Sequence, residues 1–165
     1  MQLDLHRGWA PGLIGFTVGQ HALYYAREWR FGPLFEAKLA AGMADFMLRY
    51  NPVCDALLRA ELDGRFVGSI SVDGSDPSLP AGQAHLRWFI VTDDVRGSGV
   101  GRLLFDAAMR FLHEVGFSSC YLTSFAGLDR ARHLYEKAGF VLQTEEQGTS
   151  WGTPVTEQLF LWRKT

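Results

Sequence analysis

The sequence lacks the features that mark several common classes of protein. Its two cysteines, Cys54 and Cys120, are far apart and do not have the C-x-x-C spacing of metal and redox sites. This excludes a disulfide framework and gives no indication of a zinc site. No stretch approaches the roughly 20 apolar residues of a membrane-spanning helix. The N-terminus also has no cationic segment followed by an apolar run. We therefore expect a soluble, cytoplasmic protein that holds no metal.

An excess of charge of one sign is also absent. The chain has 16 lysines and arginines against 18 aspartates and glutamates, which gives a formal net charge of −2. Nucleic-acid-binding domains usually carry a clear excess of positive charge, so we expect neither nucleic acid nor a membrane as a partner. The length of 165 residues suits one domain over residues 1–165, with enough chain for a substantial core. The sequence does not decide between a monomer and a homodimer.

The most informative stretch that is present runs from Ala84 to Gly116. It reads as an apolar strand, a short acidic turn, the glycine-rich loop 96–101, and a helix whose apolar residues recur at three- and four-residue spacing. Backbone N–H groups at the start of a helix attract an anion, and glycines let a phosphate approach the main chain closely. The loop is therefore predicted to bind a phosphate-bearing ligand, although a plain strand-to-helix turn remains an alternative.

Three types of phosphate-binding loop place glycines between a strand and a helix. A P-loop requires Lys followed by Ser or Thr after its last glycine, whereas Gly101 is followed by Arg102 and Leu103. A dinucleotide-binding loop spaces its glycines G-x-G-x-x-G, whereas the order here is G-x-G-x-G. The remaining pattern resembles the Arg-x-x-Gly-x-Gly/Ala signature of the GCN5-related N-acetyltransferase (GNAT) superfamily, with Arg96, Gly99 and Gly101 in its three fixed places.

A second segment strengthens this resemblance. Residues 134–140, Leu-Tyr-Glu-Lys-Ala-Gly-Phe, resemble the run that closes the following helix in the same superfamily. Asp129 is expected to cap the start of that helix, and Gly139 is expected to end it. The N-terminal run from Gly12 to Met47 also resembles the acetyltransferase half of proteins that join a MarR-type DNA-binding domain to such a domain. We expect this chain to be a stand-alone relative.

The fold class that follows is α/β (α+β). The resemblance implies the GNAT fold, a mixed central sheet of about seven strands with helices on both faces. The patterns predict strands at residues 13–18, 56–62, 65–72, 84–91, 118–124, 141–146 and 155–163. They predict helices at residues 20–29, 33–50, 100–115 and 129–138, and residues 1–12 show little pattern.

The resemblance also implies acetyl-CoA as the co-substrate and assigns its binding to three groups of residues. These are Phe89, Ile90 and Val91 in the strand; Arg96, Gly97, Ser98, Gly99, Val100, Gly101 and Arg102 in the loop; and Ser124, Asp129, Arg132 and Tyr135 at the other edge. Relatives often carry an asparagine seven residues before the tyrosine, where this sequence has Leu128.

The implied reaction is the transfer of an acetyl group to a primary amine of a small molecule or peptide by direct attack. By resemblance, Tyr135 protonates the departing thiolate. An alkylamine is mostly protonated at neutral pH, so a base is also needed. Glu28, Tyr24, His85 and a carboxylate acting through water all remain candidates for this role. The alternative function is a coenzyme A-binding regulatory or interaction module with little or no catalysis.

Overall fold

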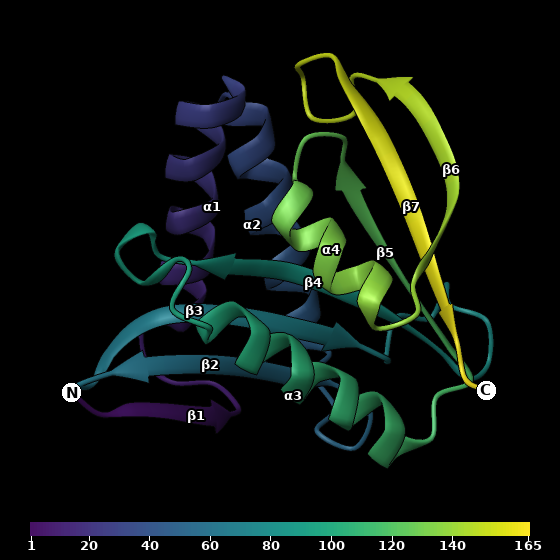
Figure 1. The fold of residues 1–165 in the computed structure, drawn as a ribbon, viewed down its shortest axis with the longest axis horizontal. Coiled ribbons are helices and arrows are strands. Elements are labelled where there is room, and N and C mark those ends of the chain that lie inside the picture. The colour runs from purple at the N-terminus through teal and green to yellow at the C-terminus, as the bar shows by residue number, and fades with distance from the viewer.

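The computed structural model describes residues 1–165 and is built around one seven-stranded sheet with the order β1-β2-β3-β4-β5-β7-β6 (Figure 1). Its strands are β1 (Leu3–Arg7), β2 (Ala56–Leu62), β3 (Arg65–Asp73), β4 (Gln83–Val91), β5 (Ser119–Phe125), β6 (Val141–Gly148) and β7 (Val155–Arg163). Strands β4 and β5 pair in parallel, and all other neighbours are antiparallel. The mixed sheet predicted from the sequence is confirmed.

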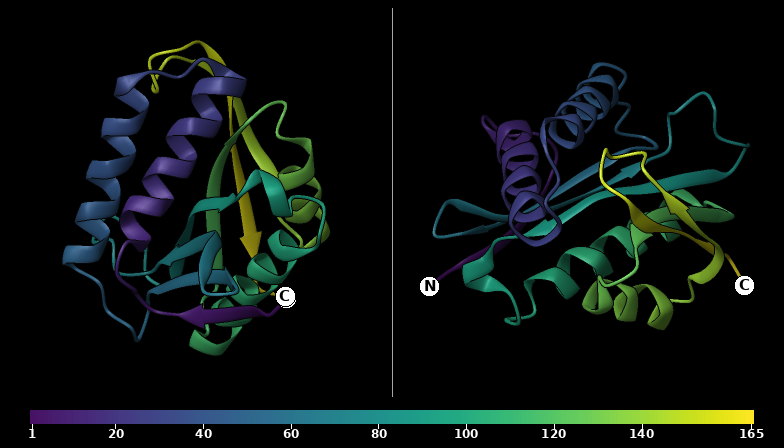
Figure 2. Two further views of the ribbon diagram at one scale, coloured as in Figure 1. Left: turned by 90° about the vertical axis from the view of Figure 1, so that its left-hand side faces the viewer. Right: turned by 90° about the horizontal axis from the view of Figure 1, so that it is seen from above.

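Helices cover both faces of this sheet, as predicted. They are α1 (Leu13–Trp29), α2 (Pro33–Leu48), α3 (Val100–Val115) and α4 (Asp129–Lys137), with a short 3₁₀ turn at Asp93–Val95. Helices α1 and α2 lie on one face, and α3 and α4 lie on the other (Figure 2). None of the helices combines the length and apolar character that crossing a membrane requires.

Several elements follow directly from local sequence. The buried residues of α3 recur at helical spacing and face the sheet; they are Val100, Leu104, Phe105, Ala108, Phe111 and Leu112. Pro33 occupies the start of α2, where its missing N–H costs nothing. Asp63 and Gly64 connect β2 to β3 with φ angles of 50° and 79°, the backbone that a two-residue hairpin turn needs.

The first predicted strand is wrong. Residues 13–18 form the opening turns of α1, where Leu13, Thr17 and His21 are buried at four-residue spacing. A short apolar run fits a strand or a buried helix equally well, and here packing on the sheet selects the helix. The seventh strand is instead β1, which pairs with β2 at the edge of the sheet. Most of its residues are exposed, so it carries little hydrophobic pattern.

Two predicted helix boundaries also need correction. Asp129 is the first residue of α4, and Leu128, which provides no side-chain hydrogen bond, occupies the capping position. Helix α2 ends at Leu48, because Arg49 leaves the helical conformation at φ −108° and ψ 8°. Its side chain binds both carboxylate oxygens of the buried Asp73, at 2.7 and 2.6 Å.

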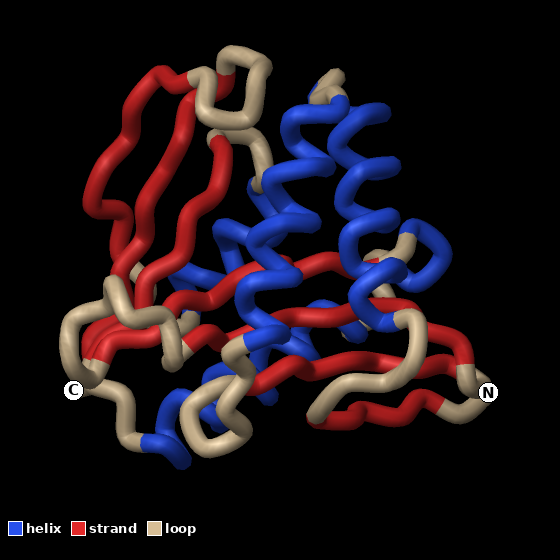
Figure 3. Tube along the Cα trace, turned by 180° about the vertical axis from the view of Figure 1, so that it is seen from behind, coloured by secondary structure: helices blue, strands red, loops and turns tan.

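The sheet opens between β4 and β5. These strands pair only over Gln83–His85 and Ser119–Tyr121, and beyond this point β5, β6 and β7 turn away from β1–β4 (Figure 3). The ladder between β3 and β4 slips between Ser69 and Ser71, which pair with Ile90 and Arg87. Strand β4 therefore contains an extra residue at this point, and its Trp88 has a φ of 52°.

Candidate functional site

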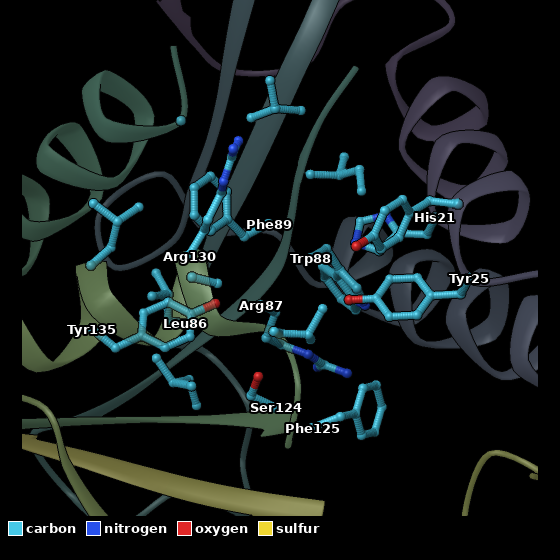
Figure 4. Close-up of a pocket in the computed structure, with 18 of the residues that line it drawn as sticks. His21, Tyr25, Leu86, Arg87, Trp88, Phe89, Ser124, Phe125, Arg130 and Tyr135 are labelled. Carbon is cyan, nitrogen blue, oxygen red and sulfur yellow. The ribbon is translucent and has the colours of Figure 1, made fainter. Parts of the chain in front are cut away.

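A large cleft lies where β4 and β5 separate, with a volume of about 1190 Å³. Its walls come from α1, α2, β4, the loop before α3, the end of β5 and the start of α4 (Figure 4). Most residues predicted for the site line this cleft: Tyr24, Glu28, His85, Phe89, Ile90, Val91, Arg96, Gly97, Gly99, Gly101, Arg102, Ser124, Asp129 and Tyr135. Residues from distant parts of the chain therefore meet in one cavity.

Three predicted residues do not line the cleft. The Ser98 hydroxyl donates a hydrogen bond to the Val95 carbonyl inside its own loop. The Val100 side chain is buried in the core beneath α3, so only its backbone is available. Arg132 donates to Glu136 one turn along α4. The backbone of Val100 thus remains open to a ligand, whereas the side chains of Ser98 and Arg132 are engaged by neighbouring protein groups.

The loop before α3 leaves a set of backbone N–H groups free. Leu103 donates the first intrahelical hydrogen bond, to the Gly99 carbonyl at 3.0 Å, so the N–H groups of Val100, Gly101 and Arg102 have no partner within the helix. No side chain caps this end of the helix. Gly99 adopts a φ of 94°, which an L side chain rarely tolerates. The geometry suits an anion such as a diphosphate.

The Arg96 side chain shapes this loop. It donates to the Val91 carbonyl at 3.2 and 3.0 Å, and it pairs with Asp93 at 2.9 Å. Its guanidinium also lies 4.2 Å from the centre of the Tyr24 ring. Arg96 thus ties the loop to β4 and α1, and its side chain is already engaged by protein groups.

Strand β4 presents unpaired backbone groups to the cleft. The Thr92 N–H donates to the Val67 carbonyl of β3 at 2.8 Å. Since backbone groups alternate in direction along a strand, those of Val91 and Phe89 point away from β3 toward the open side. The Val91 carbonyl is occupied by Arg96, which leaves the Val91 N–H and both groups of Phe89 available to a ligand that lies along the strand.

Tyr135 enters the cleft from α4. Its ring packs against Phe105, Phe140 and Phe160, with centroid separations of 5.7, 6.1 and 6.0 Å. Its hydroxyl points into the cavity, opposite the hydroxyl of Tyr25 (Figure 4). Burial raises the pKa of Tyr135 above its ordinary value of 10. The phenol therefore remains protonated at neutral pH.

The three residues considered for the base differ in environment. Burial, followed by the nearby charge of Arg87, lowers the pKa of His85 to about 3, and its ring stacks on Tyr121 at 4.0 Å. Glu28 is half exposed and accepts a hydrogen bond from Arg27 at 2.9 Å. The Tyr24 ring lies under Arg96. His85 is thus a very weak base, whereas Glu28 is a half-exposed carboxylate that is paired with Arg27.

Several residues of the cleft were not predicted from the sequence. On the α1 and α2 side these are mainly aromatic: Tyr25, Phe35, Trp88, Phe125 and Trp151. Arg87 and Arg130 also line the cavity. The sequence did give a reason to expect a role for Arg87, because it is a charged residue in the middle of a mostly apolar strand. The aromatic residues gave no such signal, since each fits a buried position equally well.

The charge balance of the cleft is positive. Its arginines are Arg87, Arg96, Arg102 and Arg130, and its carboxylates are Glu28 and Asp129. A Cβ atom on Gly97 would lie 3.9 Å from a terminal nitrogen of Arg130, so this guanidinium borders the loop that precedes α3. Arg87, Arg96 and Arg102 each pair with an aspartate outside the lining, namely Asp73, Asp93 and Asp106. Arg130 has no such partner, so its charge is the one that can attract an anionic ligand.

Comparison with known proteins gives consistent results. Residues 19–140 match the model of the acetyltransferase (GNAT) family. The mycothiol acetyltransferase of Propionibacterium freudenreichii subsp. shermanii is 31% identical over 99 residues, which cover 60% of this chain and 27% of that protein. The match thus spans about a quarter of the length of this curated relative.

Solved structures share the fold at low sequence identity. A ribosomal-protein-alanine N-acetyltransferase from Brucella melitensis superimposes with a TM-score of 0.77 at 16% identity, covering 98% of this chain and 99% of that one. The PaiA N-acetyltransferase from Thermoplasma acidophilum, in complex with coenzyme A, gives 0.70 at 15% identity, covering 99% and 100%.

Proposed function

Because the chain belongs to the acetyltransferase (GNAT) family, we propose that it is an N-acetyltransferase that moves an acetyl group from acetyl-CoA to a primary amine of a small molecule or peptide. The observation that carries this proposal is the arrangement of the cleft. An uncapped helix N-terminus, unpaired backbone groups of β4 and the Tyr135 hydroxyl all face one cavity.

The residues present fit coenzyme A. The backbone N–H groups of residues 99–102 would hold its diphosphate, with Arg102 and Arg130 adding positive charge at the same end. Phe89 and Val91 would bind its extended pantetheine arm through the backbone groups that point away from β3. Ser124 and Asp129 border the opposite edge. Leu128 supplies no polar side chain where relatives often carry asparagine, so we assign this contact to Ser124 and Asp129, the nearby polar side chains of the cleft.

The chemistry required of the chain is two proton transfers and the stabilisation of one charge. Acetyl-CoA supplies an activated acetyl group as a thioester; the amine forms the C–N bond and the C–S bond breaks. Tyr135 donates a proton to the departing sulfur. One free N–H group of β4 that the pantetheine arm does not occupy stabilises negative charge on the acetyl oxygen. A base removes the proton that the amine loses.

We propose Glu28 as this base. It is the carboxylate on the α1 side of the cleft, whereas Asp129 lies at the start of α4. Tyr24 holds Arg96 in place through its ring, so we propose that it acts as a positioning residue. The low pKa of His85 argues against His85.

Titration calorimetry with acetyl-CoA tests the cofactor site, and release of free coenzyme A thiol tests the reaction. The variant Gly101→Glu adds a negative charge in the first turn of α3, where its Cβ atom would lie 3.5 Å from the side chains of Phe89 and Val91. It is expected to weaken acetyl-CoA binding by about 10-fold or more. Arg110→Gln is the matched control, because it also lowers the net charge by one and lies on the exposed side of α3. Absence of acetyl-CoA binding to the unaltered protein at millimolar concentration would contradict the proposal. Binding without turnover of any amine would favour a coenzyme A-binding module.

A further inference from the structure

The half of the cleft that faces α1 and α2 has a distinctive composition. Its walls are aromatic and aliphatic side chains from five elements or loops: Tyr25, Phe35, Leu39, Trp88, Phe125 and Trp151. Tyr25 contacts Phe35 and Phe125 at centroid separations of 5.0 and 6.0 Å, and Phe35 contacts Trp151 at 5.4 Å. Such a surface accepts a large apolar group and gains little from a polar one.

One positively charged side chain, that of Arg87, lines the cleft together with these aromatic and aliphatic side chains. Arg87 extends from β4 and lines the cleft together with Ser124 and Phe125; in the view of Figure 4 it appears between Tyr135 and Tyr25. Its guanidinium lies 4.0 Å from the centre of the Trp88 ring and donates one hydrogen bond, to Asp73 at 3.1 Å. A guanidinium has five N–H donors, so most of those on Arg87 are not used by the protein.

The backbone explains why Arg87 is held there. The extra residue in β4 puts Trp88 on the α1 and α2 side, whereas Leu86 and Phe89 pack on the α3 side. Helix α2 passes close to this point: a Cβ atom on Gly42 would lie 3.2 Å from a terminal nitrogen of Arg87 and 3.3 Å from the Trp88 ring. The guanidinium is thus fixed between the tryptophan ring and a helix that lacks a side chain at this position.

Arg87 shares its carboxylate partner with a second arginine. Asp73 is fully buried, and both of its oxygens also accept hydrogen bonds from Arg49, which in turn pairs with the exposed Asp45. On the opposite wall, Glu28 is paired with Arg27. Glu146 and Glu157 line an adjoining hollow of about 290 Å³ that shares Ser124 and Phe125 with the cleft. The acceptor half therefore offers a fixed cation with unused N–H donors within aromatic walls.

We propose that the acceptor is an amine that also carries a carboxylate and a large apolar group, as an aromatic amino acid does. Arg87 binds the carboxylate through its unused N–H donors, and the aromatic walls bind the apolar side chain. This specificity rests on the proposed acetyltransferase function. Arg87 acts as a specificity-determining residue, and the acceptor's amino group is left to react with the thioester.

The test compares two acceptors that differ only in the carboxylate, L-phenylalanine and 2-phenylethylamine, with spermidine as a polycationic third. For the unaltered protein, kcat/KM is expected to be about 10- to 100-fold higher for L-phenylalanine than for 2-phenylethylamine, since hydrogen bonds to charged groups are among the stronger ones. Calorimetric titration of both amines into the protein with coenzyme A is expected to give the same order of affinity without turnover.

The variant Arg87→Gln should remove this preference. Asp73 keeps its two bonds to Arg49, so the buried carboxylate remains paired and the fold is expected to survive. We expect kcat/KM for L-phenylalanine to fall about 10- to 100-fold, with no change for 2-phenylethylamine or in acetyl-CoA affinity. Arg87→Lys is expected to restore part of the loss, and Arg110→Gln to change neither acceptor.

The remaining outcomes distinguish the proposed role of Arg87 from the proposed acetyltransferase function. Equal turnover of the matched pair, a preference for spermidine, or an equal loss for both acceptors in Arg87→Gln would overturn the role of Arg87. Binding of acetyl-CoA without acetylation of any carboxylate-bearing amine would also overturn it, while leaving the cofactor site intact. Failure of acetyl-CoA to bind would overturn the proposed function, and this inference with it.

Discussion

The variant Tyr135→Phe removes one oxygen atom and tests whether Tyr135 is the general acid of the proposed mechanism. In Tyr135→Phe the ring can keep its packing against Phe105, Phe140 and Phe160. The hydroxyl faces the cleft and donates to no protein group, so its loss is expected to change the free energy of unfolding by less than about 1 kcal/mol. The variant therefore separates catalysis from stability.

The expected effect on catalysis is much larger. Positioned general acids contribute roughly 10²- to 10⁴-fold, which corresponds to about 3 to 5 kcal/mol of activation free energy. Because burial keeps the pKa of Tyr135 above its ordinary value, the unaltered protein retains this proton over the whole neutral and mildly alkaline range. We expect kcat in Tyr135→Phe to fall by about 100-fold or more, with KM for acetyl-CoA unchanged.

The assay is the release of coenzyme A thiol with the best acceptor, alongside calorimetric titration of acetyl-CoA. Tyr121→Phe is the matched control, because Tyr121 is a partly buried tyrosine on β5 that does not line the cleft. Unchanged kcat in Tyr135→Phe would refute the assignment of the acid. An equal loss in Tyr121→Phe would mean that the effect is not specific to the cleft.

Three further predictions concern the core, the response to pH and the base. Leu104→Ala should lower the free energy of unfolding by roughly 3 kcal/mol in urea titrations, because Leu104 is fully buried, whereas Leu103→Ala on the exposed side should cost well under half of that. Burial lowers the pKa of His21 from 6.5 to about 4, outweighing the opposing hydrogen bond to the backbone. The unfolded chain therefore binds a proton first, so the contribution of His21 to stability should be full above about pH 6.5 and fall by about 3 kcal/mol on going to pH 4. His85, whose pKa is lowered to about 3, should add a further loss in the same range. His21→Gln should flatten this part of the curve, and an unchanged slope would contradict the assignment. Glu28→Gln should reduce kcat by about 100-fold, while Glu36→Gln, on an exposed part of α2, should not; equal activities would exclude Glu28 as the base.

The sequence predicted correctly those parts of the structure whose conformation depends on residues that are close together in the chain. The Asp63–Gly64 turn requires positive φ angles and so sets the β2–β3 hairpin. The apolar spacing of residues 100–112 sets the buried side of α3. The loop at residues 96–101 leads into the uncapped start of that helix because of its glycines. Each of these features follows from the identity and spacing of neighbouring residues.

The apolar run at residues 13–18 is the contrary case. Its pattern fits a strand or a helix, and the choice depends on what it packs against. In the fold, Leu13 belongs to a cluster with Met43 of α2 and Leu57 of β2. Contacts with residues more than 25 positions away thus decide the conformation of this segment, which is why local pattern predicted it wrongly.

The sequence by itself determined the order of most elements, the glycine-rich loop before α3 and the segment that carries Tyr135, since these depend on the spacing of near neighbours. Only the tertiary structure decided the half of the cleft that faces α1 and α2. There, one extra residue in β4 reverses the alternation of side chains after Arg87. The slip arises from pairing with β3 and is stabilised by packing under α2. This pairing with a distant segment cannot be predicted from the residues of β4, although it determines the directions of the Arg87 and Trp88 side chains.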